Sequence, residues 1–489
     1  MSPFLMLIAI FLPILSSICL PAVKFRSETS WKIVAEIIAL ATSAVVLLLL
    51  LDRPEELVLV RFSRNTSISF GIDGAGSVFA GLIAILWPIA VLYSFEYMSH
   101  EERQRPFFMF YLMTYGVTLG IAFSGNILTM YIFYELLTLV TIPLVIHTYT
   151  REAVLATRKY IYYMLGGAAL GFMSVVYILR FSRGVGFTYG GVLGWMASHS
   201  TGFGSWLFLL SFLGFSIKAA MFPFHSWLPD AGVAPTPVTA LLHAVAVVKA
   251  GAFACMRLTY YCYGPEYVKG TWVQTVLMLL TAFTVVYGCS MAVKETHLKR
   301  RLAYSTVSNL SYILFGVTIM TPAGLFGAMC HLVFHAVMKI SAFFCAGAIM
   351  HQSHKEYVHE TNGFALRMPW VYAAFTVSAL GMMGVPGTCG FLSKWYLASA
   401  AIQSGSLWAM IGVGCLLISS LLTAIYMMTI VIRGCFPERG FSKESLGDLR
   451  DPSWQMLVPL LLFTIAIITM GLWATPLTGY LSTVAEGLM

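Results

Sequence analysis

Long apolar segments are the feature that most limits what this sequence can fold into. A helix needs about 20 consecutive apolar residues to cross the hydrocarbon core of a bilayer, and such segments recur along the whole chain with short polar stretches between them. Only 10% of the residues are charged and the mean hydropathy is +0.82, whereas a soluble domain carries about 25% charged residues. Lipid is therefore the expected solvent for most of the chain.

About fourteen membrane-spanning helices can be placed along the sequence. Their length excludes a β-barrel, whose strands would show about ten alternating residues between turns. The expected spans are 3–22, 33–51, 74–97, 107–124, 126–148, 157–181, 204–227, 236–260, 273–292, 302–320, 324–350, 370–398, 408–432 and 454–475. The predicted fold class is thus an all-α polytopic membrane protein.

Lysine and arginine residues are distributed unevenly among the connections between these spans. Roughly eighteen lie in odd-numbered connections and about seven in even-numbered ones. The positive-inside rule then places the odd-numbered connections in the cytoplasm and both termini outside. The basic loop Lys294–Arg301 contributes most. Topology accounts for most of the formal net charge of +8, which gives little support to nucleic-acid binding.

Five ionisable side chains lie inside predicted spans, where a charge is costly. Counting the basic residues of the connections leaves Lys218, Lys249, Lys339 and Lys394 in the spans, and Glu135 is the acidic residue deep within one. Each would cost about 2.5–3.5 kcal/mol at the centre of a membrane helix. Structural ion pairs, or lysines that reach out to the headgroups, are the alternatives. Because three lysines would still lack an acidic partner, the excess favours a path for cations, above all protons.

Two spans contain a proline that should break the helix in mid-membrane. Pro223 in the seventh span and Pro386 in the twelfth each remove a backbone hydrogen-bond donor. Irregular backbone at that depth is tolerated only inside protein or beside a water-filled cavity. Each broken span also carries a lysine, and the two lie five spans apart. Because an odd number of spans per unit inverts the second copy, the pattern predicts two inverted repeats.

Histidines accompany the lysines in the eighth and eleventh spans. His243 and Lys249 are six residues apart, about 120° from one another on a regular helix, and His243 is either a satisfied buried residue or part of a relay. His331, His335 and Lys339 recur every four residues on one helix face. The two histidines of that face could bind a metal, but no third ligand is evident and the lysine would repel the ion. Neutral imidazoles are better suited to pass protons between lysines.

No cofactor site is expected in this chain. The nine cysteines are scattered singly without a C-x-x-C pair, so neither an iron–sulfur cluster nor a zinc site has a sequence signature. Glycine-rich motifs for dinucleotides or phosphates are also missing. We therefore expect no catalytic centre here and assign any redox cofactors to partner subunits. The sequence does not decide whether the assembly is redox-driven or an antiporter.

Six stretches resemble the antiporter-like membrane subunits shared by respiratory complex I, the multisubunit Mrp cation/proton antiporters and the membrane-bound hydrogenases. These stretches are Tyr134-Glu135-Leu136, Lys218–Gly232 (KAAMFPFHSWLPDAG), Pro235–His243 (PTPVTALLH), Lys299–Thr306 (KRRLAYST), His331–Lys339 (HLVFHAVMK) and Gly390–Lys394 (GFLSK). The resemblance implies fourteen helices with inverted five-helix repeats in spans four to eight and nine to thirteen. The corresponding domains are a three-helix segment at 1–106, the repeats at 107–265 and 266–435, and a loop with the last span at 436–489.

The resemblance also implies roles for the buried residues. In that family, the glutamate at the position of Glu135 pairs with the lysine at the position of Lys218. Protons then pass through the positions that match, in order, Lys249, His335, Lys339 and Lys394. The sequence departs from the family at His297, where many members have an acidic residue. The chain ends soon after the last span and is therefore most like the shorter Mrp D-type subunit and its counterparts.

The expected function is proton translocation by one membrane subunit of an Mrp-type antiporter, a complex I-type pump or a hydrogenase complex. Sodium stays open as a second coupled ion, and the expected location is the plasma membrane of a prokaryote, with other membrane subunits as partners. The relay residues are Glu135, Lys218, His243, Lys249, His331, His335, Lys339 and Lys394. A self-contained carrier for an organic solute and a structural spacer subunit with an inactive channel are the alternatives.

Overall fold

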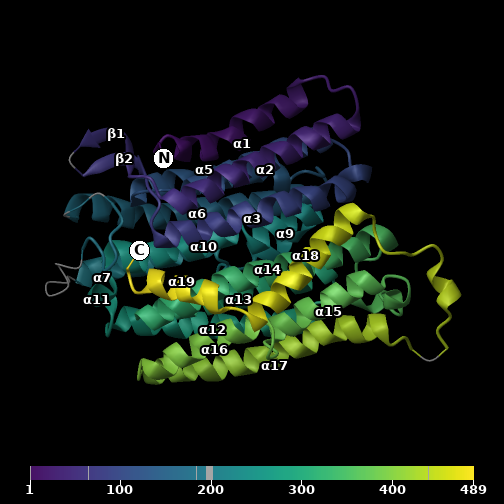
Figure 1. Ribbon diagram of the computed structural model, residues 1–489. Coiled ribbons are helices and arrows are strands. Elements are labelled where there is room, and N and C mark those ends of the chain that lie inside the picture. Colours follow the sequence, from purple (N-terminus) through teal and green to yellow (C-terminus); the bar gives the residue numbers. More distant parts are fainter. Residues whose placement is uncertain are drawn as a thin grey trace.

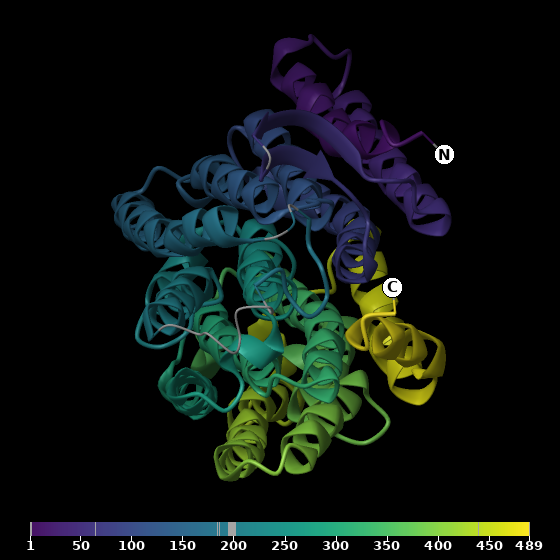
Figure 2. The same cartoon turned by 90° about the vertical axis from the view of Figure 1, so that its left-hand side faces the viewer.

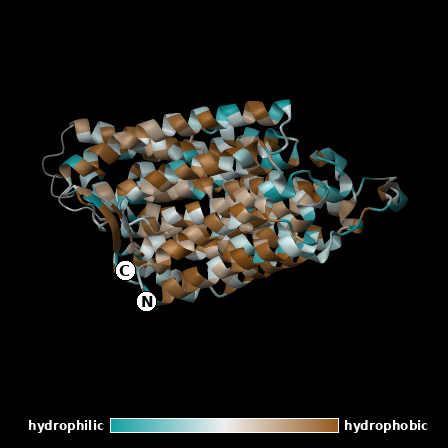
Figure 3. Ribbon diagram, turned by 90° about the horizontal axis from the view of Figure 1, so that it is seen from above, coloured by the Kyte–Doolittle hydropathy of each residue, from teal (hydrophilic) through white to brown (hydrophobic). Residues whose placement is uncertain are grey.

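The computed structural model describes residues 2–63, 65–182, 184, 186–193, 202–438 and 440–488. Helices make up most of the described chain and run side by side as a bundle (Figure 1). The first helix begins and the last helix ends at the same end of this bundle (Figure 1). Hydrophobic residues line the length of the helices, and hydrophilic residues gather toward the connections (Figure 3).

The first half of the chain runs to the end of the eighth predicted span. They are α1 (Leu5–Ala22), α2 (Glu28–Asp52), α3 (Gly74–Tyr97), η1 (Met98–His100), α4 (Gln104–Ala122), α5 (Ile127–Val145), α6 (Arg151–Phe181), α7 (Gly202–Lys218), α8 (Trp227–Asp230), η3 (Ala231–Val233), α9 (Thr236–Ala244), α10 (Val247–Met256) and the π-helical turn η4 (Arg257–Tyr263). The helices of the second half are α11 (Pro265–Val268), α12 (Trp272–Lys294), α13 (Leu298–Thr318), α14 (Pro322–Ser353), η5 (Val358–Glu360), η6 (Phe364–Leu366), α15 (Pro369–Met383), α16 (Cys389–Gln403), α17 (Leu407–Cys435), η7 (Lys443–Leu446), α18 (Trp454–Leu472) and α19 (Thr475–Ala485).

Ten helices within the described residues are long and apolar enough to cross a membrane. Two shorter apolar helices, α7 and α15, belong to the spans that were expected to be broken. Helical segments occupy all fourteen predicted ranges, which confirms a polytopic helical membrane protein. The number fourteen, the inverted repeats and the division into four domains stay predictions.

Helix α14 lies at the centre of the bundle, and the N-terminal helices lie at its edge. The described residues of α14 between Gly324 and Met350 are nearly all buried, and α14 packs against α3, α9, α13, α15, α16, α18 and α19. In contrast, α1 and α2 form an outer layer at one side (Figure 2). The helix that carries two candidate histidines and one candidate lysine is therefore surrounded by protein along nearly its whole length.

The seventh predicted span is broken, as its proline predicts. Helix α7 ends at Lys218, residues 219–226 are not helical, and α8 begins at Trp227. Pro223 lies within that non-helical stretch. The Ile217 carbonyl near the end of α7 accepts from the Ala220 N–H at 3.0 Å and from the Trp227 indole N–H at 2.9 Å. The end of α7 is thus stabilised by a protein contact, although Pro223 itself is exposed.

The twelfth predicted span is broken as well. Helix α15 ends at Met383, α16 begins at Cys389, and Pro386 lies between them. Gly384 follows α15 with φ +86°, a left-handed conformation that side chains disfavour, and its N–H donates to the Leu380 carbonyl at 3.1 Å. A glycine at this position therefore ends the first half-helix without strain.

The eighth predicted span is also interrupted, and no proline or glycine marks the place. Helix α9 ends at Ala244 and α10 begins at Val247, because Ala246 leaves the helical region with φ −84° and ψ −91°. The interruption separates His243 from Lys249. Their expected angle of about 120° on one regular helix is therefore wrong.

A small β-hairpin lies at the end of the bundle where the chain begins (Figure 1). Strands β1 (Leu57–Ser63) and β2 (Thr66–Phe70) are antiparallel. Asn126, which caps α5, donates from its side chain to the Ser67 carbonyl at 3.0 Å and to the Ser69 hydroxyl at 2.8 Å. The prediction of an entirely helical chain missed this hairpin, which is too short to alter the helical class.

A buried ion pair joins the start of α3 to the end of the eighth span. Arg257 is 1% exposed, and its guanidinium donates to both carboxylate oxygens of Asp73, the residue that caps α3. Three aromatic rings surround this guanidinium, those of Phe187, Phe253 and Tyr261. The count that left only four lysines inside spans was wrong, because Arg257 also lies within the predicted span 236–260.

Replacement of Asp73 by Asn should destabilise the protein, because the amide keeps the helix cap but leaves the buried Arg257 without a counter-charge. We expect the free energy of unfolding to fall by about 3 kcal/mol, as for other broken buried ion pairs. The measurement is thermal unfolding in detergent, followed by a thiol-reactive fluorophore that detects exposure of buried cysteines such as Cys255. The control is Glu28→Gln, which removes an exposed partner 3.9 Å from Lys32 and should change stability by less than about 0.5 kcal/mol. Equal unfolding temperatures for the two variants would contradict the assignment.

Candidate functional site

Six of the eight candidate residues are enclosed completely by protein. Lys218 is 1% exposed, and five others are fully buried, namely His243, Lys249, His331, His335 and Lys339. Glu135 and Lys394 are half-buried. The eight side chains come from six helices, α5, α7, α9, α10, α14 and α16.

Glu135 on α5 and Lys218 at the end of α7 are neighbours without forming a close ion pair. The Lys218 ammonium donates to the backbone carbonyl of Tyr134, and its Nζ lies 3.3 Å from the centroid of the Tyr134 ring. The Lys218 nitrogen is more than 4.0 Å from both carboxylate oxygens of Glu135. The Oε1 atom of Glu135 is buried without a hydrogen-bond partner among the described residues. The lysine is thus held one residue along α5 from the carboxylate, at a distance where the two charges still attract each other.

Lys249 and His335 make the central contact of the site. Nζ of Lys249 on α10 lies 2.9 Å from Nδ1 of His335 on α14. Because an ammonium can only donate, Nδ1 accepts, and the ring proton is then on Nε2. His331 lies one turn earlier on α14 and stacks on His335 with ring centroids 5.7 Å apart. Two imidazoles therefore extend from Lys249 along the central helix.

His331 connects this pair to Lys394. Its Nδ1 lies 2.9 Å from the hydroxyl oxygen of Ser393 on α16, the residue directly before Lys394. The Tyr312 ring of α13 stacks on His331 with centroids 5.0 Å apart, and Lys394 Nζ lies 5.3 Å from the same ring. A serine and a tyrosine thus bridge the histidine on α14 and the lysine on α16.

Lys394 is held by the break in the twelfth span. Its ammonium donates to the carbonyls of Met382 and Met383, the last two residues of α15, at 2.8 and 3.0 Å, and to the Ser420 hydroxyl at 3.0 Å. The last carbonyls of a helix have no partner within the helix, and the negative end of the helix dipole favours a cation there. The helix break therefore supplies the acceptors for this lysine.

Lys339 and His243 form a separate group on the other side of His335. The Lys339 ammonium donates to the Ser305 hydroxyl and lies 5.4 Å from the centroid of the Phe343 ring. His243 contacts the same ring with centroids 4.8 Å apart, and its Nδ1 lies 3.2 Å from the Thr306 hydroxyl oxygen. This group reaches α9 and α13 rather than α16.

The contacts therefore order the residues differently from the resemblance. The resemblance has Lys339 between His335 and Lys394. The hydrogen bonds and ring contacts instead have His331 between them, with Lys339 on a branch toward His243. No measurement tests the role of any of these residues, so their part in a relay stays a prediction.

The four lysines of the site share one property, which is that their ammonium groups donate to neutral acceptors. These acceptors are backbone carbonyls, serine hydroxyls and one imidazole nitrogen. Among the described residues, none of the four ammonium groups lies within 4.0 Å of a carboxylate. A neutral acceptor can bind an ammonium or a neutral amine, whereas a close carboxylate favours the charged form. The surroundings thus accept the lysines with or without the additional proton.

A metal-binding role for His331 and His335 receives no support from the geometry. In the described part of the chain, no three histidine, cysteine, aspartate or glutamate side chains are grouped to hold a metal ion. Both Nδ1 atoms are already engaged, with Ser393 and Lys249.

Two glycines allow the helices of the site to approach closely. A Cβ atom at Gly251 of α10 would lie 2.6 Å from the Ala219 nitrogen and 2.8 Å from Lys218 Cβ. A Cβ atom at Gly390 of α16 would lie 1.9 Å from the Gly381 carbonyl oxygen. Any larger residue would therefore separate α10 from the end of α7, or the two halves of the twelfth span from each other.

Five residues that contact the candidates through a hydroxyl or a phenol ring were not among those candidates, namely Ser305, Thr306, Tyr312, Ser393 and Ser420. Ser305, Thr306 and Ser393 lie inside two of the stretches that carry the family resemblance, and this is the signal that could have found them. Tyr312 and Ser420 have no such signal, because uncharged hydroxyls occur in many membrane helices without a role.

Residues 124–423 match the family model described as NADH:quinone oxidoreductase/Mrp antiporter, TM. The match covers more than half of the chain and includes all eight candidate residues. The chain belongs to this family. The resemblance seen in the sequence is thereby confirmed at the level of the family.

The curated relatives come from both branches of the family. The chain is 31% identical over 431 residues to NADH-quinone oxidoreductase subunit N of Desulforudis audaxviator, covering 83% of this chain and 82% of that protein. It is 29% identical over 452 residues to the putative antiporter subunit mnhA2 of Staphylococcus aureus, covering 85% of this chain. The chain spans about half the length of this antiporter relative, 55%.

Solved structures share the fold over essentially the whole chain. A chain of the membrane-bound sulfane sulfur reductase, an archaeal respiratory membrane complex, has a TM-score of 0.86 at 23% identity and covers 100% of this chain and 98% of its own. A chain of the Mrp complex from Dietzia sp. DQ12-45-1b has a TM-score of 0.83 at 21% identity, with 99% and 97% covered. A chain of respiratory complex I from Thermus thermophilus has 0.81 at 22% identity, with 99% and 100% covered. At sequence identities of 21–23%, the likeness to these solved structures shows that this chain has the same fold.

Gly251→Ala should lower the unfolding temperature, because the new methyl group would collide with the backbone at the end of α7. We expect a loss of about 1–3 kcal/mol, as for overpacking of a close-packed interior. The matched control is Gly166→Ala on α6, where nothing lies within 4 Å of the new Cβ and stability should stay the same or rise slightly. Unfolding of both purified variants in detergent measures the difference. A Gly251→Ala variant as stable as Gly166→Ala would mean that α7 and α10 are not so closely packed.

Proposed function

We propose that this chain is a proton-translocating membrane subunit of a multisubunit complex of the Mrp-antiporter, complex I or hydrogenase type. The relatives named above come from such complexes, and family membership supports a common role. The single observation that carries the proposal is the chain of buried lysines and histidines whose hydrogen bonds go to neutral acceptors. Such surroundings accept both protonation states, which a proton path needs and a structural ion pair does not.

The first step of the proposed mechanism is a movement of Lys218 between two partners. When its ammonium lies against the Glu135 carboxylate, the neighbouring negative charge favours the protonated form. When it lies against the Tyr134 carbonyl, as here, burial opposes the charge and the attraction of Glu135 is weaker. Because the two acceptors are adjacent on α5, a change of side-chain rotamer can exchange them. The movement alternately holds and releases one proton.

The proton then passes along the contacts that centre on α14. Lys249 donates to His335, the stacked His331 follows, and Ser393 leads to Lys394. An imidazole can accept a proton on one nitrogen and release one from the other, which suits it to this position. Stacked rings exchange no proton directly, so water must bridge the two histidines. Lys339 and His243 supply a second branch that meets the first at His335.

The proposal extends to partners and location. The chain would work with other membrane subunits in the plasma membrane of a prokaryote, with both termini outside and the loop Lys294–Arg301 in the cytoplasm, as the distribution of basic residues predicts. The Mrp D-type subunit and its counterparts are the proposed position of the chain within the family. Protons are the proposed cargo and sodium is the alternative coupled ion. Redox cofactors, where the complex has them, belong to partner subunits, and mass spectrometry of the native complex would identify those partners.

Glu135→Gln and Lys218→Ala should each abolish proton transport by the assembled complex, because the first removes the charge that favours the ammonium and the second removes the ammonium itself. We expect at least about a hundredfold loss, as for the removal of a proton-transferring group. The measurement is proton uptake into proteoliposomes, driven by the sodium gradient or the electron donor that the purified complex uses. Native mass spectrometry checks that each variant complex still assembles.

The matched control is Glu36→Gln on α2, which is also half-buried within a predicted span but lies away from the candidate residues. This variant should transport at the wild-type rate. Retained transport in Glu135→Gln and Lys218→Ala would reject the scheme, and an equal loss in Glu36→Gln would show that any intramembrane carboxylate matters.

Lys394→Ala distinguishes a working subunit from a structural spacer. The substitution removes the far end of the relay, so the assembled complex should lose transport by at least about tenfold while its composition stays the same. A spacer with an inactive channel predicts no change in rate. A chain that purifies alone and binds a solute without protons would instead support the carrier alternative.

A further inference from the structure

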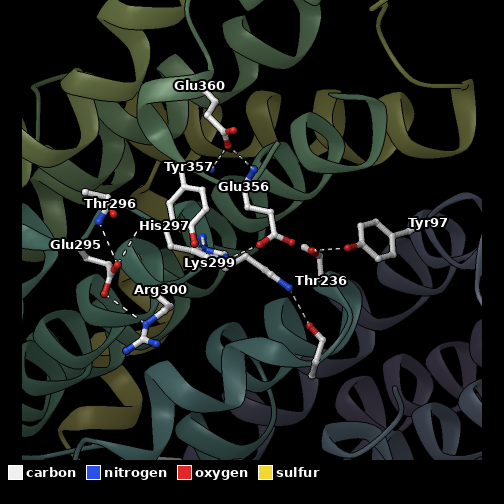
Figure 4. Close-up of polar contacts among 11 residues, drawn as sticks. Tyr97, Thr236, Glu295, Thr296, His297, Lys299, Arg300, Glu356, Tyr357 and Glu360 are labelled. Carbon is white, nitrogen blue, oxygen red and sulfur yellow. Dashed lines mark hydrogen bonds and ion pairs between the residues drawn. The ribbon is translucent and has the colours of Figure 1, made fainter. Parts of the chain in front are cut away.

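A cluster of charged residues lies where the loop Lys294–Arg301 meets the connection after α14 (Figure 4). The backbone ties the two connections together, because the Leu298 N–H donates to the Glu356 carbonyl and the Val358 N–H donates to the Thr296 carbonyl, both at 2.9 Å. The side chains of His297 and Glu356 point toward one another across this junction, and the Lys299 side chain extends past them to the Ala234 carbonyl (Figure 4). The relay described above does not use any of them.

His297 fixes the position of Glu356. Its Nδ1 accepts from the Lys299 backbone N–H at 3.2 Å and so caps α13, and its Nε2 lies 3.2 Å from Glu356 Oε2. Because Nδ1 accepts, the neutral ring carries its proton on Nε2 and donates it to the carboxylate. A second proton on Nδ1 would remove the cap, and burial together with the charge of Lys299 lowers the pKa of His297. His297 is therefore a neutral positioning residue.

Lys299 is the buried member of the cluster. The residue is only 7% exposed, and its ammonium donates to the Ala234 carbonyl at 3.1 Å. Burial lowers the pKa of Lys299 to about 8, although the carboxylates of Glu356 and Glu101 favour its charged form. This lysine can therefore exchange a proton near neutral pH, while an exposed lysine stays charged.

The charge of this amine also acts on the interior of the site. Lys299 and Lys339 are the two charges that act on the His243 ring. The carbonyl that accepts from Lys299 belongs to Ala234, two residues before the first residue of α9. Helix α9 carries His243. The Thr236 hydroxyl, which donates to the Tyr97 hydroxyl at 2.9 Å, lies close to Lys299 and Glu356 (Figure 4). Lys299 is thus between exposed carboxylates on one side and the Lys339 branch on the other.

We propose that Lys299 is the site at which protons pass between water at this end of the molecule and the His243–Lys339 branch, with Glu356 and Glu101 as the carboxylates that collect them. The inference rests on the proposed function and adds an entry site to it. It also gives the Lys339 branch a role, since that branch leads away from Lys394. By the predicted orientation this entry faces the cytoplasm.

The other charged groups nearby are engaged in holding the loops. Arg300 pairs with Glu295 at 3.3 Å and with Asp230 at 3.7 Å, and Lys355 pairs with Glu360 at 3.4 Å. The titratable groups whose charges interact with the Lys299 amine are Glu101, His243, His297 and Glu356.

The test uses the reconstituted complex with the pH varied on the side of this loop. In the wild type, Lys299 holds its proton below about pH 8, so the supply of protons from this side should fall as the pH rises through about 8. Lys299→Gln should slow transport at least about tenfold, because no group is left to carry the proton. Lys299→Arg keeps the buried cation but does not release a proton, so it should assemble and be equally slow. Glu356→Gln removes a charge that favours the ammonium, and should move the fall in rate to lower pH.

Two further variants separate this inference from the proposed function. Lys355→Gln removes a lysine from the same junction that lies outside the entry site, and it should keep the wild-type rate and pH profile. Lys249→Met removes the centre of the relay and should abolish transport. If Lys249→Met transports normally, the proposed function fails. If Lys249→Met is inactive while Lys299→Gln, Lys299→Arg and Glu356→Gln keep the wild-type rate and pH profile, the relay stands and the entry site is refuted.

Discussion

Everything in this structure depends on how the four lysines of the candidate site are kept inside a helical bundle that lies in lipid. A charge at the centre of a membrane helix costs several kcal/mol, and only one glutamate is available to compensate Lys218, Lys249, Lys339 and Lys394. The bundle lowers this cost with neutral acceptors and aromatic rings, which stabilise an ammonium without fixing its proton. The Tyr134 ring beside Lys218 and the Tyr312 ring beside Lys394 are examples. The same solution that makes the charges tolerable also makes them able to titrate.

The breaks in the helices belong to that solution. An unbroken membrane helix offers no free carbonyl in mid-span, because every interior carbonyl is used within the helix. The end of α15 in mid-membrane frees the carbonyls of Met382 and Met383, and Lys394 takes them. Gly384 and Pro386 are thus linked through the backbone to the lysine eight or more residues later. At the seventh span the acceptor comes from the neighbouring helix α5 instead, which leaves Lys218 free to turn toward Glu135.

Much of this arrangement could be predicted from the sequence, and the misses have physical reasons. Hydrophobic length locates helices, and prolines locate breaks, so the seventh and twelfth spans were predicted correctly. The interruption at Ala246 follows from packing between distant segments and has no local signal. Arg257 was missed because it lies near a span end, where basic residues are usually solvated, and its partner Asp73 is nearly two hundred residues away in the chain. The order of contacts around His331 depends on helix positions that spacing along one helix cannot give.

The two ends of the proposed relay explain why such a chain would not work alone. Glu135 and Lys394 are only half-buried, and each lies beside apolar residues that face outward, Leu139 at 59% and Trp395 at 59% exposed. If lipid covered these faces, two ionisable groups would border hydrocarbon, at a cost of up to about 2.5–3.5 kcal/mol each. A neighbouring membrane protein that covers Leu139 or Trp395 and offers polar groups would remove that cost. The positions of the two ends therefore favour protein contacts on opposite sides of the relay over lipid.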